Sequence, residues 1–305
     1  MSTRTPILLD CDPGHDDAIA LLLALGSDEL ELRGVTTVAG NQTLEKTTAN
    51  AIRVLELAGR GEIPVAAGAG RPLVREPRVA ADVHGETGLD GPDLPPPRAE
   101  PSAQHAVDFL AERMEGATLV ATGPLTNVAL LLARHPEAKP ERLVLMGGAI
   151  AEGNVTPAAE FNIWADPEAA RRVFTSGLDV TMVGLDVTHR ALVTAAHAEE
   201  LRRAGRIGGV VAELLEFYGG FHRATYGWDG SPIHDAVAVA HVIDPTLLEL
   251  ERLNVQVDTE SELCRGRTVV DLWRRTGLDP TANVAVGIDS ERFVRLLQER
   301  LARLG

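Results

Sequence analysis

The chain has 305 residues, 45% of them hydrophobic and 24% charged, a composition typical of a globular protein with a sizeable core. Its 44 acidic residues outnumber 29 basic ones, and the net charge of -15 argues against nucleic acid as a partner, because phosphate binding needs a basic face. No apolar run approaches the roughly 20 residues that cross a bilayer, and no signal-peptide pattern is present, so we expect no membrane partner. The two cysteines, Cys11 and Cys264, predict buried free thiols in a reducing, cytoplasmic setting.

Strands and helices are predicted to alternate along the chain. The predicted strands are 7–9, 31–38, 63–67, 117–122, 142–146 and 180–184, and the predicted helices between them are 16–25, 43–58, 105–114, 126–134 and 167–175. This alternation is typical of right-handed crossovers, so it predicts an α/β fold with a doubly wound, mostly parallel central sheet flanked by helices.

The rest of the chain is predicted to add helices at 207–222 and 234–242 and a late pair of strands, 247–258 and 268–273, which could be antiparallel. Neither a linker-like change of composition nor an internal repeat occurs, so we predict a single domain over residues 1–305. The segment 68–101 is rich in Gly and Pro and carries His84-Gly85-Glu86. A loop of this length is typical of a lid or a site loop, although a plain surface excursion is the alternative.

Four carboxylates crowd the turn between the first strand and the first helix, in Asp10-Cys11-Asp12-Pro13-Gly14-His15-Asp16-Asp17. One acid at a helix N-terminus is an ordinary cap, so Asp16 alone could be structural. Four acids this close repel one another, and a bound cation would neutralise them. All-oxygen ligands favour Ca²⁺ or Mg²⁺ over zinc. The turn therefore predicts a metal site, with a solvated acidic loop as the alternative.

Further unusual residues follow the other predicted strands. Gly40-Asn41 follows the second strand, Thr122-Gly123-Pro124 the fourth and Met146-Gly147-Gly148 the fifth. Asn41 could merely cap the next helix and Thr122 could merely end a strand. Open parallel sheets bind ligands at the carboxyl ends of their strands, however, so these residues together predict a site built from several loops.

Two later motifs suit sugar binding and proton transfer. Asn154, Glu160 and Asn162 offer the mixture of donors and acceptors that vicinal hydroxyls require, although each could be an ordinary loop residue. His234-Asp235 opens an apolar helix, where the pair could be a cap. Beside a metal site, Asp235 could complete the coordination and His234 could move a proton.

Several enzyme classes are disfavoured by missing motifs. Neither Gly-x-Gly-x-x-Gly after the first strand nor a Walker sequence occurs, which argues against a dinucleotide or ATP cofactor. The Asp10-x-Asp12 pair is similar to the opening of haloacid-dehalogenase-type phosphatases, but Gly14 stands where Thr or Val is expected. No Gly-x-Ser-x-Gly elbow is present for a serine hydrolase.

The motifs and their order resemble the inosine-uridine-preferring nucleoside hydrolases over essentially the whole chain. The N-terminal run from Asp10 to Ala18 is similar to the signature of that family, and the later motifs are Val38-Ala39-Gly40-Asn41, His84-Gly85-Glu86, the run from Thr122 to Asn127, Met146-Gly147-Gly148, the run from Asn154 to Asn162, and His234-Asp235. The resemblance implies an enzyme that binds one Ca²⁺ per chain and hydrolyses the N-glycosidic bond of ribonucleosides, releasing base and ribose. It also implies a homo-oligomer, dimer or tetramer, with a role in nucleoside breakdown and salvage.

The resemblance also implies roles for individual residues. The calcium ligands would be the carboxylates of Asp12, Asp17 and Asp235 and the backbone carbonyl of Thr122. Asp12 would also take the proton from a calcium-bound water, and His234 would protonate the leaving base. The residues that would bind substrate are Asp16, Asn41, Glu160 and Asn162 at the ribose hydroxyls, Asn154 and Met146 on the rim, and His84, His222 and Tyr226 near the base.

One departure leaves the preferred base open. Pyrimidine-preferring members tend to carry Gln ahead of the tyrosine, and this chain has His222 there. A catalytically silent or differently specific relative that binds ribose or nucleosides is the alternative function. Such a relative would be expected to lack Asp12 or a metal ligand, and this sequence has them all.

Overall fold

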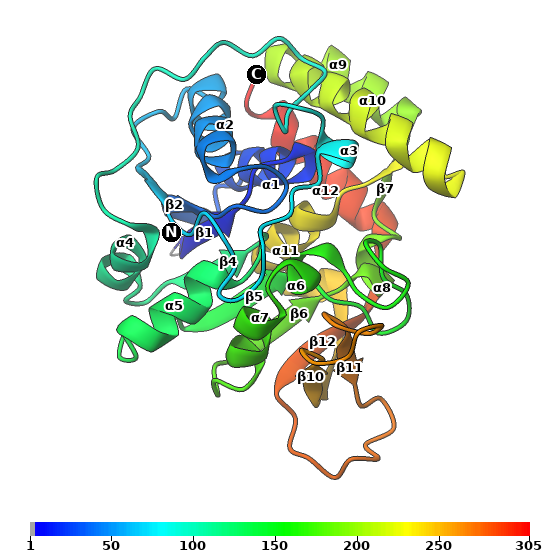
Figure 1. The fold of residues 1–305 in the computed structure, drawn as a ribbon. Helices are drawn as coiled ribbons and strands as arrows, with labels where there is room; N and C mark the ends of the chain where they lie inside the picture. Colours follow the sequence, from blue (N-terminus) through cyan, green and yellow to red (C-terminus); the bar gives the residue numbers. More distant parts are fainter. Residues whose placement is uncertain (1–3) are drawn as a thin grey trace.

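Eight strands form the central sheet of residues 4–305, which are the residues that the computed structural model describes. Their spatial order is β3 (Val65–Ala67), β2 (Leu30–Thr37), β1 (Thr5–Cys11), β4 (Thr118–Ala121), β5 (Arg142–Met146), β6 (Val180–Val183), β12 (Ala282–Ile288) and β9 (Leu248–Leu253). Neighbouring strands are parallel throughout, except for the antiparallel pair β12 and β9. The predicted doubly wound, mostly parallel sheet is confirmed (Figure 1).

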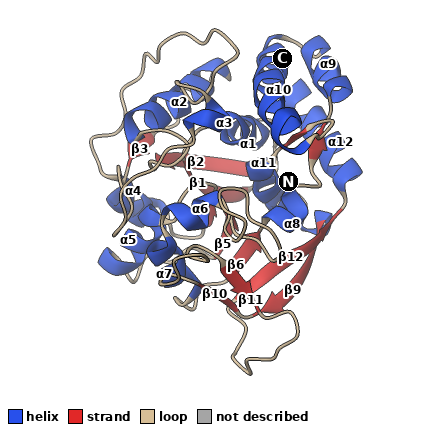
Figure 2. Ribbon diagram, turned by 45° about the vertical axis from the view of Figure 1, so that its right-hand side comes forward, coloured by secondary structure: helices blue, strands red, loops and turns tan. Residues whose placement is uncertain are grey.

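Helices cover both faces of this sheet, as Figure 2 shows. One face packs against α1 (His15–Leu25), α2 (Leu44–Leu57), α10 (Arg206–Tyr226), α11 (His234–Ile243) and α12 (Ser290–Ala302), and the other against α4 (Ala106–Arg113), α5 (Thr126–Arg134) and α7 (Pro167–Phe174). Ile7 and Leu9 of β1 point into the first layer and Leu8 into the second. Burial on both sides explains why β1 reads as a continuous apolar run.

The strand order reverses at β1. From there the chain builds β2 and β3 on one side and β4, β5 and β6 on the other. The loops that leave β1 and β4 therefore diverge, and a crevice opens at the carboxyl ends of the strands. The expectation that Asp10 lies in the turn after the first strand is wrong, because Asp10 lies within β1. Its carboxylate accepts hydrogen bonds from Thr36 (2.5 Å) and Asn127 (2.8 Å).

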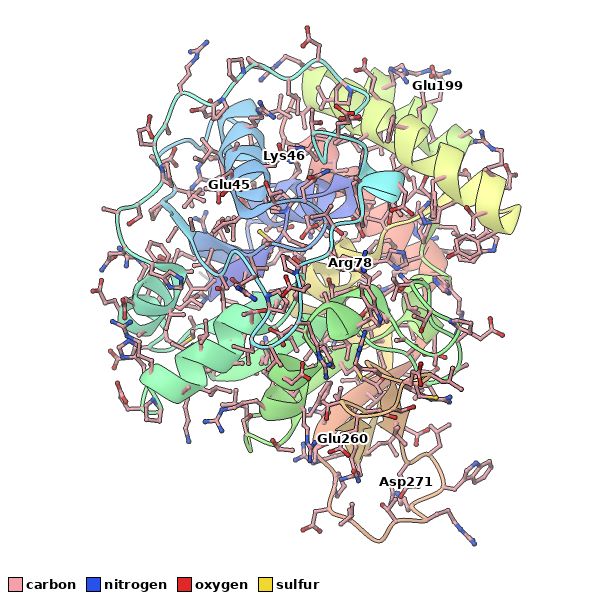
Figure 3. The ribbon with its side chains drawn as sticks, viewed as in Figure 1. Glu45, Lys46, Arg78, Glu199, Glu260 and Asp271 are labelled. Carbon is pink, nitrogen blue, oxygen red and sulfur yellow. The ribbon has the colours of Figure 1, made fainter. Side chains whose placement is uncertain are left out.

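The C-terminal region differs most from the sequence-based expectation. The predicted strand 247–258 is wrong as one element, because the chain breaks at Asn254 into β9, in the central sheet, and β10 (Val255–Val257). Only β10 forms the late antiparallel pair, with β11 (Thr268–Val270). The Asn254 side chain donates to the Asp279 carbonyl (2.7 Å), which anchors the segment after β11 that stands out from the molecule near Asp271 (Figure 3).

Several elements were not predicted. They are β12, α12, α3 (Ala81–His84), α6 (Phe161–Ala165), α8 (Leu185–Thr188), α9 (Ala195–Arg203), the short strands β7 (Leu192–Val193) and β8 (Ser231–Pro232), and the 3-10 turn Pro245–Leu247. Both cysteines are free; Cys11 is buried as expected, but Cys264 is only partly so. Among residues 4–305, no helix is both long enough and apolar enough to span a membrane.

Candidate active site

A cavity of about 330 Å³ opens at the carboxyl ends of the parallel strands. Its walls include most of the residues that the sequence analysis singled out, namely Asp16, Asn41, His84, Thr122, Met146, Asn154, Glu160, Asn162, His222, Tyr226, His234 and Asp235. Asp12 and Asp17 do not line it, but both contact residues that do. Loops far apart in the chain therefore converge on one site.

A cluster of three carboxylates adjoins the cavity, and two of them, Asp16 and Asp235, line it. Asp16 and Asp17 open α1, Asp235 lies in the first turn of α11, and one oxygen of each lies within 4.8 Å of the others. Burial, followed by the charge of Asp17, raises the pKa of Asp16 to about 8, and burial and the charge of Asp16 raise that of Asp235 well above its usual value. Buried acids this close need protons or a cation between them, and an all-oxygen set suits a hard cation.

Asp12 lies beside this cluster and is fully buried. Its Oδ2 accepts a hydrogen bond from the Asn41 backbone (2.6 Å), whereas its Oδ1 has no partner among the described residues. A Cβ at Gly40 would collide with Oδ2, and one at Gly123 would lie 2.7 Å from Oδ1, so only glycine leaves room for this carboxylate. A bound cation would satisfy a buried carboxylate oxygen that has no hydrogen-bond partner and lies next to three more acids.

Asp17, not Asp16, supplies the side chain that caps α1, whose N-cap residue is Gly14. Its carboxylate accepts hydrogen bonds from the Gly14 backbone (3.1 Å), the Asn41 amide (3.0 Å) and the Thr122 hydroxyl (2.8 Å). These donors come from three loops at the sheet edge and fix the carboxylate. Asp16 faces the cavity. The capping role that the sequence allowed for Asp16 therefore belongs to Asp17.

Glu160 and Asn162 are held by α6. Glu160 is the N-cap of this helix and accepts hydrogen bonds from the backbones of Gly148, Asn162 and Ile163 at 2.8 to 3.1 Å. Burial raises its pKa to about 7. The Asn162 amide donates to the carbonyls of Thr122 (2.6 Å) and Met146 (3.2 Å), so the carbonyl assigned to the metal already holds one hydrogen bond. Its second lone pair remains for another ligand.

An aromatic wall faces the acids. Tyr218, His222 and Tyr226 are four residues apart on α10, and Tyr226 stacks on Trp228 with ring centroids 4.6 Å apart. Tyr218, Phe221 and His189 also line this cavity and were not predicted from the sequence. The spacing of four would have placed Tyr218 on the helix face of His222 and Tyr226. His189 offers no comparable signal.

The segment 78–84 lines the cavity, and hydrogen bonds connect it to the turn between β1 and α1 that carries the acids. The backbone N–H of His15 lies 3.2 Å from Nδ1 of His84, and the His15 ring bonds the Asp90 carbonyl (2.8 Å). This part of the 68–101 segment is therefore a site loop, not a surface excursion. It also brings Arg78, labelled in Figure 3, to the cavity wall.

His234 is the first residue of α11 and is buried at the cavity wall. Burial lowers its pKa well below the usual value for histidine. Its Nδ1 lies 2.7 Å from the Thr188 hydroxyl, a neighbour that the sequence analysis did not single out. No sequence signal links these two residues, because they lie 46 positions apart.

Comparison with known proteins supports the resemblance seen in the motifs. The model of the inosine-uridine preferring nucleoside hydrolase family matches residues 7–295. A pyrimidine-specific ribonucleoside hydrolase RihA of Shewanella sp. (strain MR-7) is 53% identical over 97% of this chain and 96% of its own length. A protein of the same name from Klebsiella pneumoniae is 52% identical over 97% of this chain and 98% of its own.

Solved structures agree on the fold. A purine-preferring ribonucleoside hydrolase from Gardnerella vaginalis superposes with a TM-score of 0.93 at 36% identity, over 98% of this chain and 99% of that one. The plant nucleoside hydrolase PpNRh1 gives 0.92 at 36% identity with the same coverage. This chain therefore belongs to the family of inosine-uridine preferring nucleoside hydrolases, and it is a hydrolase that acts on the N-glycosyl bond of ribonucleosides.

Proposed function

We propose that this hydrolase depends on Ca²⁺ and prefers pyrimidine ribonucleosides. The observation that carries the metal assignment is the group of four buried carboxylates, one of which has an oxygen that no other residue of 4–305 hydrogen-bonds. We assign the carboxylates of Asp12, Asp17 and Asp235 and the carbonyl of Thr122 as ligands. Asp16, which we assign to ribose, lies in the same carboxylate cluster, so a bound ribose would lie directly against the ion.

In the proposed mechanism, one group of residues acts on the ribose side of the N-glycosidic bond and another acts on the base side. When bound, calcium would orient a water molecule and lower its pKa. Asp12 accepts the proton of the attacking water. Asp16, Glu160 and the amides of Asn41 and Asn162 hold the ribose hydroxyls, with Asn154 and Met146 on the rim. The carboxylates also stabilise the positive charge that develops on the ribosyl ring.

His234 would act at the other end, as the acid that protonates the departing base. The His84, His222 and Tyr226 side chains would contact the base itself. A general acid contributes about 10²- to 10⁴-fold, and this contribution vanishes when the leaving group is stable as an anion. His234→Ala should therefore be slow on uridine and nearly unimpaired on 4-nitrophenyl riboside. Equal damage on both substrates would assign the acid elsewhere, with Tyr226 and His222 as the next candidates.

Pyrimidine preference rests on the relatives. Two proteins named pyrimidine-specific are 52–53% identical to this chain, whereas the structure named purine-preferring is 36% identical. The test is base release from uridine, cytidine, inosine and adenosine, with and without chelation of metal. We expect the largest kcat/KM on uridine or cytidine, and restoration of activity by Ca²⁺ after chelation. Full activity after exhaustive chelation excludes calcium dependence, and binding without turnover would indicate a silent relative.

Broader properties follow the family. We propose a single catalytic domain over residues 1–305, a homo-oligomer, and a cytoplasmic role in nucleoside breakdown and salvage. Light scattering after size-exclusion chromatography measures the oligomeric state directly. A monomeric mass would contradict that part of the proposal without affecting the proposed chemistry.

A further inference from the structure

Thr188 and His234 meet at the ends of two helices. Thr188 is the last residue of α8, His234 is the first residue of α11, and the Thr188 Oγ1 lies 2.7 Å from Nδ1 of His234. Thr188 is fully buried and His234 is 6% exposed. The contact is therefore shielded from water, where a single hydrogen bond has its largest effect on side-chain orientation.

Backbone hydrogen bonds join the segment that follows Thr188 to the segment that precedes His234. β7, just after α8, pairs with β8, just before α11, through Leu192 with Pro232 and Val193 with Ser231. The Ile233 N–H also donates to the Ala191 carbonyl (3.1 Å). The short two-stranded sheet thus fixes the distance between the hydroxyl and the ring. Although β7 and β8 have only two residues each, their pairing holds Thr188 close to His234.

The hydroxyl holds one ring nitrogen and leaves the other free. Among the described residues, neither the Thr188 hydroxyl nor Nε2 of His234 has another hydrogen bond, and the His234 ring lines the cavity. The hydroxyl proton therefore has one acceptor, Nδ1. A neutral ring bonded in this way carries its own hydrogen on Nε2, the nitrogen left for a ligand in the cavity.

A hydroxyl suits this position in both states of the ring. It donates to Nδ1 when the ring is neutral, and it can rotate to accept from Nδ1–H when the ring carries two protons. The other neighbours of the ring, His189 at 5.6 Å and His222 at 6.4 Å between ring centroids, pack against it without a hydrogen bond. If the His234 ring were flipped, Nδ1 would lose its hydrogen bond to Thr188. The Thr188 hydroxyl therefore favours the observed ring orientation over the flipped one.

We propose that Thr188 is a positioning residue that fixes the orientation and tautomer of His234 and so aims Nε2 at the departing base. The proposal rests on the proposed function, because it needs His234 to act on the leaving group. It predicts that loss of the hydroxyl affects only reactions in which the leaving base must receive a proton.

The kinetic test compares Thr188→Val, which keeps the shape without the hydroxyl, with Thr188→Ser, which keeps the hydroxyl. Thr181→Val is the matched control, because Thr181 is buried in β6 and its side chain makes no hydrogen bond among the described residues. On uridine we expect kcat of Thr188→Val to fall about 10- to 100-fold, which is less than the full 10²- to 10⁴-fold contribution of a general acid because His234 itself remains. Thr188→Ser should restore it to within about 3-fold, and on 4-nitrophenyl riboside all variants should stay within about 3-fold of wild type.

A second measurement does not depend on catalysis. Long-range ¹H–¹⁵N spectra of histidine-labelled protein, assigned with His234→Gln, report which ring nitrogen carries the proton. We expect Nε2–H in wild type and Thr188→Ser, and a mixture of tautomers in Thr188→Val and Thr188→Ala. An unchanged tautomer, unchanged kcat on uridine, or equal slowing on both substrates would overturn the proposal. If wild type released no base from any nucleoside, the proposed function would fail while the spectra still tested the role of Thr188.

Discussion

Asp235 is the carboxylate that the other acids of the site repel most directly. Besides burial, the charges of Asp16, Asp17 and Asp12 all raise its pKa, and one oxygen of Asp235 lies within 4.8 Å of oxygens of Asp16 and Asp17. An amide at this position is neutral and removes this repulsion. We therefore expect metal-free Asp235→Asn to have a higher Tm than metal-free wild type near pH 7.

The same substitution should remove the response to calcium. Ligand binding to the folded state raises Tm, so Ca²⁺ should raise the Tm of wild type and leave that of Asp235→Asn unchanged. Calorimetry with excess chelator or excess Ca²⁺ measures both effects. Asp28→Asn is the matched control, because the Asp28 side chain is 85% exposed and should behave as wild type. A calcium-induced rise of wild-type size in Asp235→Asn would remove this residue from the ligand set.

The residues that we propose to bind the ribose are few, and their oxygen atoms are buried. Asp16, Asn41, Glu160 and Asn162 all lie at the cavity wall and are at most 8% exposed. A 2′-deoxynucleoside would leave at least one of these groups unpaired, and sites built to bind a hydroxyl reject analogues that lack it by about 10⁴-fold. We expect 2′-deoxyuridine to be cleaved at least about 10³-fold more slowly than uridine, measured as kcat/KM. Similar values would contradict the ribose assignments.

At the scale of elements, the turn between β1 and α1 connects the acids to the site loop. Gly14, the N-cap of α1, has φ of −97°, so its backbone would accept alanine. Space is what forbids it: a Cβ there would collide with the His84 ring and lie 2.9 Å from the Asn41 amide nitrogen. Gly14→Ala should therefore displace both side chains and reduce kcat/KM on uridine by at least about 10-fold.

The control for this substitution is Gly209→Ala. Gly209 lies in α10, where an added Cβ meets nothing within 4 Å. Alanine in a helix interior is favoured over glycine by roughly 0.5–1 kcal/mol, so this variant should keep full activity and gain slight stability. Unfolding curves show whether Gly14→Ala remains folded. Wild-type activity in a folded Gly14→Ala would mean that the loop contact of His84 is unimportant.

The site was more predictable from the sequence than the C-terminal fold. The acids of the β1–α1 turn, Asn41, Thr122 and Met146 lie at the ends of strands, and the alternation of strands and helices already places such residues at one edge of a parallel sheet. The other site residues came from later motifs and from the resemblance to a known family. Thr188 was not predicted, because its role depends on a contact with a residue distant in the chain, whereas Tyr218 carried a local signal in its spacing of four from His222. The break at Asn254 depends on the Asp279 carbonyl in the same way. By contrast, α12 carries helical spacing in Phe293, Leu297 and Leu301, so its omission reflects an unused signal.

At the scale of the whole molecule, stability should depend on pH through His241, a buried histidine of α11 away from the cavity. It is 4% exposed, and its Nδ1 has no partner among residues 4–305. Burial, with repulsion from Arg142 and a smaller opposing effect of Asp244, lowers its pKa from 6.5 to about 4. Above pH 6.5 the ring is neutral in both the folded and the unfolded state, so its contribution is fully present there.

As the pH falls from 6.5 to about 4, the unfolded chain binds a proton at this ring before the folded protein does. The free energy of unfolding must therefore decrease by up to about 3 kcal/mol through this group and level off below about pH 4. His241→Leu removes the titration and fills the site with an apolar side chain. Urea unfolding of both proteins between pH 7 and pH 4 should give curves that diverge, with the variant losing less stability in acid. Parallel curves would mean that the folded protein protonates His241 as readily as the unfolded chain does.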